Sequence, residues 1–316
     1  MQKNESKPMM KTNQIGEEFT IPLAHLNIAA CRYGHENLPI ILACHGWLDN
    51  LNSFKPLAEA FLASDLVDQY QLITFDWPGH GLSEHRPGLY PLNWVDYVYD
   101  LDNLIETLLV GVNQPDLVLL GHSLGGIVAS AYNACAPQRV NKLILIEAIA
   151  PLFEDASLIK QRLNKSLKQH RVHANTHNSN KQPIPTSLKP SGYNSIEIVA
   201  KARHKLTGLD EKWCHLIARR NLVNVDEKYC WRSDSRLKLD SMYRMTFEQV
   251  DALMSHNETQ TLLVLGENGY KQLKSAKKQV LDWFTEVQLI ELPGCHHLHM
   301  SHATSLLAQI RAFILK

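Results

Sequence analysis

The sequence predicts an α/β protein with a mostly parallel, doubly wound sheet of about eight strands and an inserted helical cap. Short continuous apolar runs, typical of strands buried on both faces, alternate with longer stretches of helical spacing. This alternation breaks after Pro151 and resumes near residue 246. At 316 residues, the chain is long for one compact domain and short for two, which favours one domain with an insertion.

The first half of the chain predicts an edge hairpin followed by alternating strands and helices. The hairpin is expected at 18–23 and 26–33, antiparallel at the sheet edge. Strands are expected at 39–44, 71–75, 116–120 and 140–146, with helices at 54–63, 94–110 and 124–135. The last of these helices is rich in small residues, so it can pack closely on a sheet.

The second half predicts the cap and the end of the sheet. Helical patterns at 157–171, 195–206 and 211–223 surround a polar tract, 170–193, which we expect to be a mobile loop. Later elements are expected as a helix near 246–255, a strand at 261–265, a helix near 272–284, a strand at 287–292 and a helix at 303–315. The predicted domains are a core of residues 1–150 and 241–316 and a cap of residues 151–240.

Composition predicts an ordinary globular protein with no attraction to polyanions. The 32 Lys and Arg residues balance the 32 Asp and Glu residues, so nothing in the net charge favours nucleic acid or an anionic membrane. No apolar run approaches the roughly 18 residues that span a bilayer, and the first twenty residues lack a secretory signal. The six cysteines show no CxxC spacing, which favours free thiols. We therefore expect a soluble, cytoplasmic protein.

The strongest chemical signal is G-x-S-x-G at 121–125, between a predicted strand and a predicted helix. Such a tight turn strains the serine backbone and projects its hydroxyl from the end of the sheet, while the glycines avoid Cβ clashes. The N-terminus of the following helix directs free N–H groups at the site. Ser123 is therefore the predicted nucleophile.

A second signal, His45-Gly46-Trp47, closes the strand 39–44. A serine acyl-transfer enzyme needs two N–H donors where negative charge develops on the carbonyl oxygen. We assign these donors to the backbones of Trp47 and Leu124. The loop D-W-P-G-H-G at 76–81 is interpreted as structural support for this oxyanion loop.

Together these segments resemble the N-terminal half of the α/β-hydrolase superfamily. The motifs H-G-x, D-x-P-G-x-G and G-H-S-x-G-G each follow a successive strand. The continuation CHGWLDNLNSF at 44–54 is similar to serine hydrolase-like proteins, a subgroup related to haloalkane dehalogenases and epoxide hydrolases. Those two enzyme classes carry an aspartate where this chain has Ser123. The resemblance, which spans about 18–150 and 245–316, therefore implies the α/β-hydrolase fold and ester-type acyl transfer.

The resemblance also places the histidine base after the last strand, where four histidines lie between 292 and 302. In related sequences the base precedes a His/Gln-Leu/Met pair by three and four residues. His296 fits this spacing to His299 and Met300, and His297 is the alternative. His299 and His302 are expected to be structural.

The acid departs from the usual pattern. Most family members place an aspartate in a G-x-x-D turn after the penultimate strand, but this turn reads Gly-Glu-Asn-Gly at 266–269. The dehalogenase-like branch implies another source, an acid at the end of the strand after the nucleophile helix, and Glu147 stands there. A buried carboxylate needs a partner, which His296 would supply. Glu267 is the fallback, with Asn268 or no acid as further possibilities.

The resulting prediction is a serine-dependent carboxylic ester hydrolase with a Ser-His-Glu triad and no cofactor. A thioesterase, a lactonase, a C–C bond hydrolase or a catalytically silent binding module are the alternatives. A small-molecule ester is the expected partner. Neither the late histidines nor His170, His173 and His177 are accompanied by Cys or carboxylates in ligand spacing, so we expect no metal. The predicted substrate pocket consists of His45, His122, Trp213 and Trp231.

Overall fold

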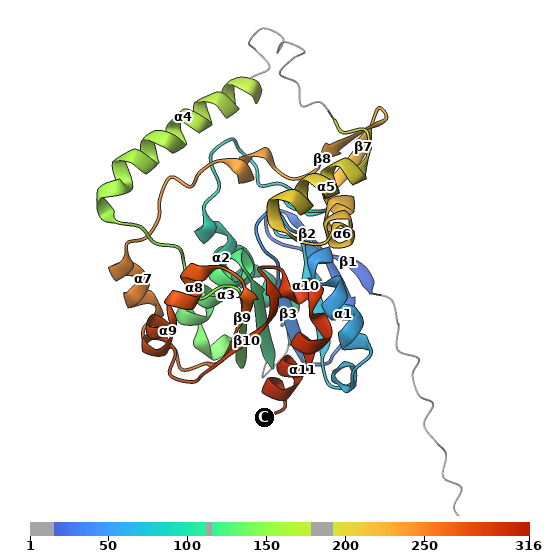
Figure 1. The fold of residues 1–316 in the computed structure, drawn as a ribbon, viewed down its shortest axis with the longest axis vertical. Coiled ribbons are helices and arrows are strands. Elements are labelled where there is room, and N and C mark those ends of the chain that lie inside the picture. The colour runs from blue at the N-terminus through green and yellow to red at the C-terminus, as the bar shows by residue number, and fades with distance from the viewer. Residues whose placement is uncertain (1–15, 112–115, 178–191) are drawn as a thin grey trace, which may run out of the picture.

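The computed structural model describes residues 16–111, 116–177 and 192–316. Its centre is an eight-stranded sheet with the strand order β1-β2-β4-β3-β5-β6-β9-β10 (Figure 1). The strands are β1 (Glu17–Pro22), β2 (Asn27–Tyr33), β3 (Ile40–Cys44), β4 (Gln71–Phe75), β5 (Leu117–His122), β6 (Lys142–Ile146), β9 (Gln260–Asn268) and β10 (Val287–Cys295). This confirms the predicted α/β-hydrolase fold.

Strand direction follows from the connections. β1 and β2 form the predicted antiparallel hairpin, and β2 is also antiparallel to β4. All other pairs in this sheet are parallel. Every residue of β3, β4 and β5 is buried, which explains why their sequences are largely apolar. The carboxyl ends of β3, β5 and β6 therefore meet at one edge of the sheet.

Helices cover both faces of the sheet. One face packs against α1 and α11, and the other against α2, α3, α7 and α9. The helices of this part are α1 (Lys55–Leu62), α2 (Trp94–Leu108), α3 (Leu124–Cys135), α7 (Phe247–Met254), α8 (Lys271–Ser275), α9 (Lys277–Trp283), α10 (Leu298–Ser301) and α11 (Ala303–Ile314). Short 3₁₀ turns cover Leu51–Phe54, Asp65–Asp68, Pro137–Arg139, Ala156–Leu158 and Ser235–Lys238.

The segment between β6 and α7, residues 151–240, was predicted as a cap, and we call it the cap segment. It contains α4 (Ile159–His177), α5 (Ile196–Thr207), α6 (Glu211–Asn221) and a separate hairpin of β7 (Leu222–Val225) and β8 (Lys228–Trp231). Figure 1 shows α4 along the outer side of the molecule. α5 and α6 hydrogen-bond to the loop that follows β3.

Two expectations for the cap segment were wrong in detail. Residues 170–177 belong to α4 instead of a loop, because no Gly or Pro interrupts the helix there and His170 stacks on Tyr90, 5.5 Å between ring centroids. Residues 178–191 of the polar tract lie outside the described residues, and Tyr193 at its end forms an antiparallel bridge with Tyr229. The chain also leaves the helical conformation at Leu222 to form the β7–β8 hairpin. None of the described helices is long and apolar enough to cross a lipid bilayer.

Candidate active site

Ser123 occupies the sharp turn between β5 and α3. Its backbone has φ 51° and ψ −117°, a conformation that non-glycine residues rarely adopt. The Ser123 N–H donates to the carbonyl of Ile146 at 3.0 Å, so the neighbouring strand holds the turn in place. A strained backbone that the surrounding structure maintains is typical of a functional position.

Gly125 shows why the turn needs small residues. A Cβ atom at this position would lie 2.0 Å from the carbonyl oxygen of Cys44, at the end of β3. α3 can therefore begin directly beside the loop that follows β3 only because Gly125 has no side chain. This close approach brings the N-terminus of α3 next to the predicted oxyanion loop.

Glu147 follows β6 in the same way that Ser123 follows β5. It also has a positive φ, 51°, and its N–H donates to the carbonyl of Val264 at 2.9 Å. Its side chain is buried, and its Oε2 atom lies 3.2 Å from Nδ1 of His296. The sequence thus places a strained residue at the carboxyl ends of two adjacent parallel strands, one with a hydroxyl and one with a carboxylate.

The carboxylate of Glu147 is satisfied by several donors. Its Oε1 accepts from the N–H of Gly266 at 2.7 Å, and its Oε2 accepts from the N–H of Tyr270 at 3.1 Å. Burial alone would raise the pKa of Glu147, but the hydrogen bonds from His296, Gly266 and Tyr270 leave it below its ordinary value. Glu147 is therefore ionised at neutral pH and able to orient an imidazole.

His296 comes directly after β10, and two rings flank it. The centroid of Tyr270 lies 4.2 Å from that of His296, and the centroid of His122 lies 4.8 Å away. His122 immediately precedes Ser123, so the His296 ring lies beside the serine turn. With Nδ1 engaged by Glu147, the Nε2 atom of His296 is the one left to act as a base.

We had expected His122 to line the substrate pocket, but it supports His296 instead. Its ring is fully buried, and its Nε2–H donates to the carbonyl of His296 at 2.9 Å. Burial, followed by the neighbouring His299, lowers the pKa of His122 well below its ordinary value. His122 is therefore neutral and fixes the backbone of the candidate base.

His297, the alternative base, and Glu267, the alternative acid, have other surroundings. Nε2 of His297 lies 3.4 Å from Oδ2 of Asp49, in the loop after β3. Glu267 is exposed near the end of β9, where its backbone carbonyl accepts from Nζ of Lys274 at 2.9 Å. The geometry thus brings Glu147 together with His296, and it separates both alternatives from that pair.

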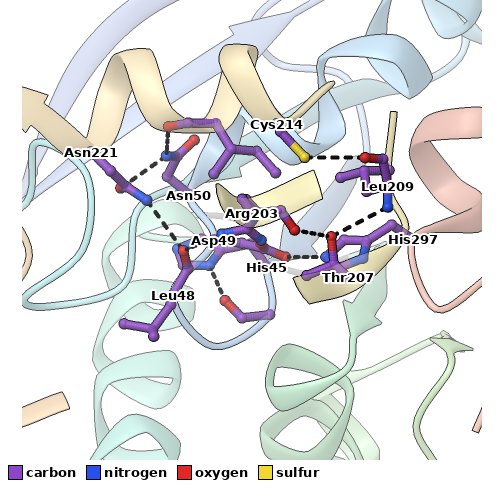
Figure 2. A network of polar contacts seen from close by, with 12 residues as sticks. His45, Leu48, Asp49, Asn50, Arg203, Thr207, Leu209, Cys214, Asn221 and His297 are labelled. Carbon is purple, nitrogen blue, oxygen red and sulfur yellow. Dashed lines mark hydrogen bonds and ion pairs between the residues drawn. The ribbon is translucent and has the colours of Figure 1, made fainter. Parts of the chain in front are cut away.

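The loop after β3, residues 45–50, is held by the cap segment (Figure 2). Leu48 has a positive φ of 59°, and its carbonyl accepts from Nη1 of Arg203 at 3.3 Å and Nδ2 of Asn221 at 3.2 Å. Nδ2 of Asn50 donates to the side chain of Asn221 at 2.9 Å and to the carbonyl of Ile217 at 2.9 Å. Helices α5 and α6 thereby fix the conformation of this loop.

Asp49 is the charged centre of the same network. Its carboxylate, which is buried, forms an ion pair with Arg203 and faces His297 (Figure 2). His122 lies on the same carboxylate, with 3.6 Å between its Nδ1 and Oδ2 of Asp49. Burial would raise the pKa of Asp49, but Arg203 and then His297 bring it well below its ordinary value. Asp49 is therefore a buried anion that links the loop after β3, the cap segment and the segment after β10.

The loop at 76–81 supports the loop after β3, as we expected. The N–H of Trp77 donates to Nε2 of His45 at 3.0 Å, and the indole N–H of Trp77 donates to the His45 carbonyl at 2.9 Å. Asp76 accepts from the N–H of Leu51 at 2.8 Å. His45 is fully buried between these loops, and burial lowers its pKa to about 4. His45 is thus structural, contrary to its predicted place in the pocket.

A cavity of about 450 Å³ opens at Ser123. Its lining comprises Trp47, Leu92, Asn93, Trp94, Tyr97, Ser123, Leu124, Ile127, Glu147, Ala148, Ile149, Ala150, Leu152, Arg236, Leu237, Leu239, Asp240, Ser241, Arg244, Tyr270 and Leu273. The residues predicted as oxyanion donors, as nucleophile and as acid therefore share one largely apolar space. Its size suits a small organic ligand.

The two cap tryptophans were wrongly assigned to this pocket. Trp213 lies in α6, where it packs against a small cluster around Cys214 and Lys212 covers its ring. Trp231 ends β8 and is partly exposed beside Tyr193. Both aromatic side chains stabilise the cap segment itself. The residues Tyr270 and Arg244, which do line the cavity, were missed because nothing in their local sequence marks them.

In the described part of the chain, no group of three or more His, Cys, Asp or Glu side chains is arranged to hold a metal ion. The histidines after β10 instead contact one another, His122 and Asp49. The centroids of His299 and of His122, which ends β5, lie 4.0 Å apart.

Comparison with known proteins agrees with this geometry. A family model described as the alpha/beta hydrolase fold matches residues 39–176. A crystal structure of a hypothetical protein from Pseudomonas aeruginosa PAO1 aligns with a TM-score of 0.80 at 29% identity, covering 95% of this chain and 99% of that chain. The chain has the α/β-hydrolase fold.

Two curated relatives of this α/β-hydrolase carry names that describe an activity. A serine hydrolase-like protein of Dictyostelium discoideum is 27% identical over 95% of this chain and 82% of its own length. An esterase of Escherichia coli K12 is 36% identical over 40% of this chain and 45% of its own length. Together with the fold, these similarities identify a hydrolase.

Proposed function

We propose that this hydrolase cleaves carboxylic esters through an acyl-enzyme on Ser123. The observation that carries the proposal is the contact between His296 Nδ1 and Glu147 Oε2, 3.2 Å, beside the cavity that Ser123 lines. This is the arrangement of base and orienting acid that activates a serine hydroxyl. The similarity to a protein named as an esterase supports an ester as the substrate.

The proposed reaction has two halves. Nε2 of His296 takes the proton of the Ser123 hydroxyl as its oxygen attacks the ester carbonyl. The negative oxygen of the tetrahedral intermediate accepts from the N–H groups of Trp47 and Leu124. His296 then returns the proton to the leaving alcohol. In the second half His296 activates water, which hydrolyses the acyl-enzyme and releases the carboxylic acid.

Two further parts of the proposal concern cofactors and the cellular compartment. The chemistry needs only side chains and backbone donors, so no metal or organic cofactor is part of it. All six cysteines are free, and Cys31, Cys44 and Cys214 are buried. Free thiols are typical of a reducing compartment, and we propose the cytoplasm.

A fluorophosphonate probe tests the nucleophile. The intact protein should be labelled and should hydrolyse a p-nitrophenyl ester, whereas Ser123→Ala should do neither. Ser301→Ala is the matched control, since Ser301 is exposed and its hydroxyl contacts His302 outside the cavity. Absence of labelling in the intact protein, or equal labelling of Ser123→Ala, contradicts the proposal and favours a silent binding module.

The nature of the acyl donor is tested in the same assay. Thioesters, lactones and substrates with an activated C–C bond would use the same triad. We expect oxygen esters to give the highest kcat/KM in a panel matched for acyl length. If a thioester is hydrolysed much faster than the matching oxygen ester, thioesters replace oxygen esters as the proposed substrate class.

A further inference from the structure

The ionisable side chains that line the cavity differ in how they are paired. The lining contains Glu147, Arg236, Asp240 and Arg244. Glu147 contacts His296, and Asp240 forms an ion pair with Lys165 at 2.6 Å. Arg236 is bound to both carboxylate oxygens of Asp234 and to the backbone carbonyls of 86–88. These three groups therefore already have partners within the protein.

Arg244 is different. Within residues 16–111, 116–177 and 192–316, its guanidinium forms no hydrogen bond and no ion pair. The side chain is nevertheless half-buried. Arginine carries five donors and stays charged at neutral pH, so a half-buried guanidinium without a protein partner is an unusual feature.

The backbone around Arg244 is fixed by its neighbour. Met245 forms a parallel bridge with Phe153, and its carbonyl accepts from the N–H of Glu154 at 3.0 Å. The start of the cap segment and its end are joined at this point. Arg244 is therefore held at the wall of the cavity by structure, and it does not belong to a free surface loop.

The local charge balance is positive. Two carboxylates lie near Arg244, and each of them already has a cationic partner: Glu154 binds Arg162, and Asp240 binds Lys165. Burial and then the neighbouring Arg162 lower the pKa of Arg244, and the opposite influence of Glu154 and Asp240 is smaller. One positive charge is left unbalanced in this part of the cavity.

We propose that Arg244 binds a carboxylate carried by the substrate, so that the enzyme prefers esters with an anionic group away from the scissile bond. A planar guanidinium pairs with a carboxylate through two parallel hydrogen bonds. A monoanion also matches the single unbalanced charge, whereas a phosphate dianion would exceed it. This inference rests on the proposed function, because it names the substrate class of the same site.

Two matched pairs of esters test it. The mono-p-nitrophenyl ester of glutaric acid and p-nitrophenyl pentanoate differ by a carboxylate on the acyl side. A butyryl ester of 4-hydroxybenzoate and phenyl butyrate differ by one on the alcohol side. We expect at least one anionic ester to have a higher kcat/KM than its neutral partner. In Arg244→Gln that ester should lose roughly 10- to 100-fold, as for a hydrogen bond to a charged group.

Two further variants sharpen the result. Arg244→Lys keeps the charge without the planar fork and should retain part of the preference. Arg171→Gln is the control, because Arg171 is exposed on α4 and does not line the cavity. Neutral esters should change less than about threefold in Arg244→Gln, since they make no contact that depends on this charge. Equal losses for neutral and anionic esters, or no loss for either, overturn the inference.

Failure of the inference can be told from failure of the proposed function. If Ser123-dependent hydrolysis of neutral esters is observed and Arg244→Gln does not change the hydrolysis of anionic esters, only the inference about Arg244 is contradicted. Absence of Ser123-dependent hydrolysis would contradict the proposed function. Glutarate binding is then measured independently of turnover, by its effect on thermal unfolding. Glutarate should raise the Tm of the intact protein and not that of Arg244→Gln, and an equal shift in both proteins contradicts the assignment.

Discussion

The carboxylate of Glu147 occupies the space that a side chain at Gly269 would fill. A Cβ atom at Gly269 would lie 2.1 Å from Oε1 of Glu147 and 2.5 Å from its Oε2. Gly269 stands where the G-x-x-D turn of related sequences has its aspartate. The glycine therefore leaves room for the carboxylate that Glu147, our proposed acid, brings from the end of β6.

This exchange predicts the effect of removing the acid. Glu147→Gln should keep the fold but lower kcat for a p-nitrophenyl ester by roughly 10²- to 10⁴-fold, because His296 loses the carboxylate that orients it and stabilises its protonated form. Glu267→Gln is the control and should stay near the activity of the intact protein, since Glu267 is exposed. The reverse ranking would move the acid to Glu267.

A second prediction restores the acid from the usual strand. Gly269→Asp alone should lower both stability and activity, because its side chain collides with the Glu147 carboxylate. In a Glu147→Ala background the same substitution removes the collision and offers His296 a new carboxylate. We expect the double variant to be more active than Glu147→Ala, measured as kcat on a p-nitrophenyl ester. A double variant that is folded yet no more active would show that only β6 can supply the acid.

The sequence predicted those parts of the site that local chemistry determines. Ser123 stands out as the candidate nucleophile because a short motif, a strand and a helix coincide within a few residues. The strands β3 to β6 could be predicted because buried parallel strands are largely apolar. The contact between Asp49 and Arg203 joins residues 154 positions apart, and no local pattern records it. Arg244 was missed for the same reason, since its importance lies in partners that it lacks.

The cap segment shows a further limit. Aromatic residues such as Trp213 are equally suited to a pocket wall and to packing between helices, and only the three-dimensional arrangement decides. The polar composition of 170–177 suggested a loop, yet α4 continues through it because contacts such as His173 with Ser235, 2.8 Å, hold the helix. Tertiary contacts can override the preference of a short polar tract.

A third prediction concerns the hold of the cap segment on the loop after β3. Asn221→Ala removes one of the two side-chain donors to the Leu48 carbonyl and leaves Asn50 without its amide partner. If this loop positions the Trp47 N–H, the substitution should weaken the stabilisation of the transition state more than the binding of the substrate. We expect kcat to fall about tenfold or more, with KM changed by less than about threefold.

The matched control for that variant is Asn52→Ala. Nδ2 of Asn52 also donates to a carbonyl of α6, that of Leu216, at 3.1 Å, but it does not contact Leu48. Loss of stability alone would affect both variants similarly, so thermal unfolding is measured beside the kinetics. A positioning role predicts a larger fall in kcat for Asn221→Ala, and the same kcat in both variants would mean that Asn221 serves the fold only.

The last prediction is a decrease in stability at mildly acidic pH. The pKa of buried His45 is lowered to about 4 and that of buried His80 to about 3, while His122 and His299 also lie well below the ordinary value of 6.5. Below about pH 6.5 the unfolded chain therefore binds protons that the folded protein excludes. The free energy of unfolding should fall as pH drops toward 4, with a slope approaching about 1.4 kcal/mol per pH unit for each histidine.

Urea unfolding at about pH 7.5, 6 and 5 measures this slope, and His299→Leu identifies one of its sources. The His299 ring is fully buried against Phe54, and neither of its nitrogens has a hydrogen-bond partner among the described residues. Leucine has a similar volume and binds no proton, so the variant should lose about one proton's share of the pH dependence. If its slope equalled that of the intact protein, the buried neutral histidine could not be the cause of the acid sensitivity.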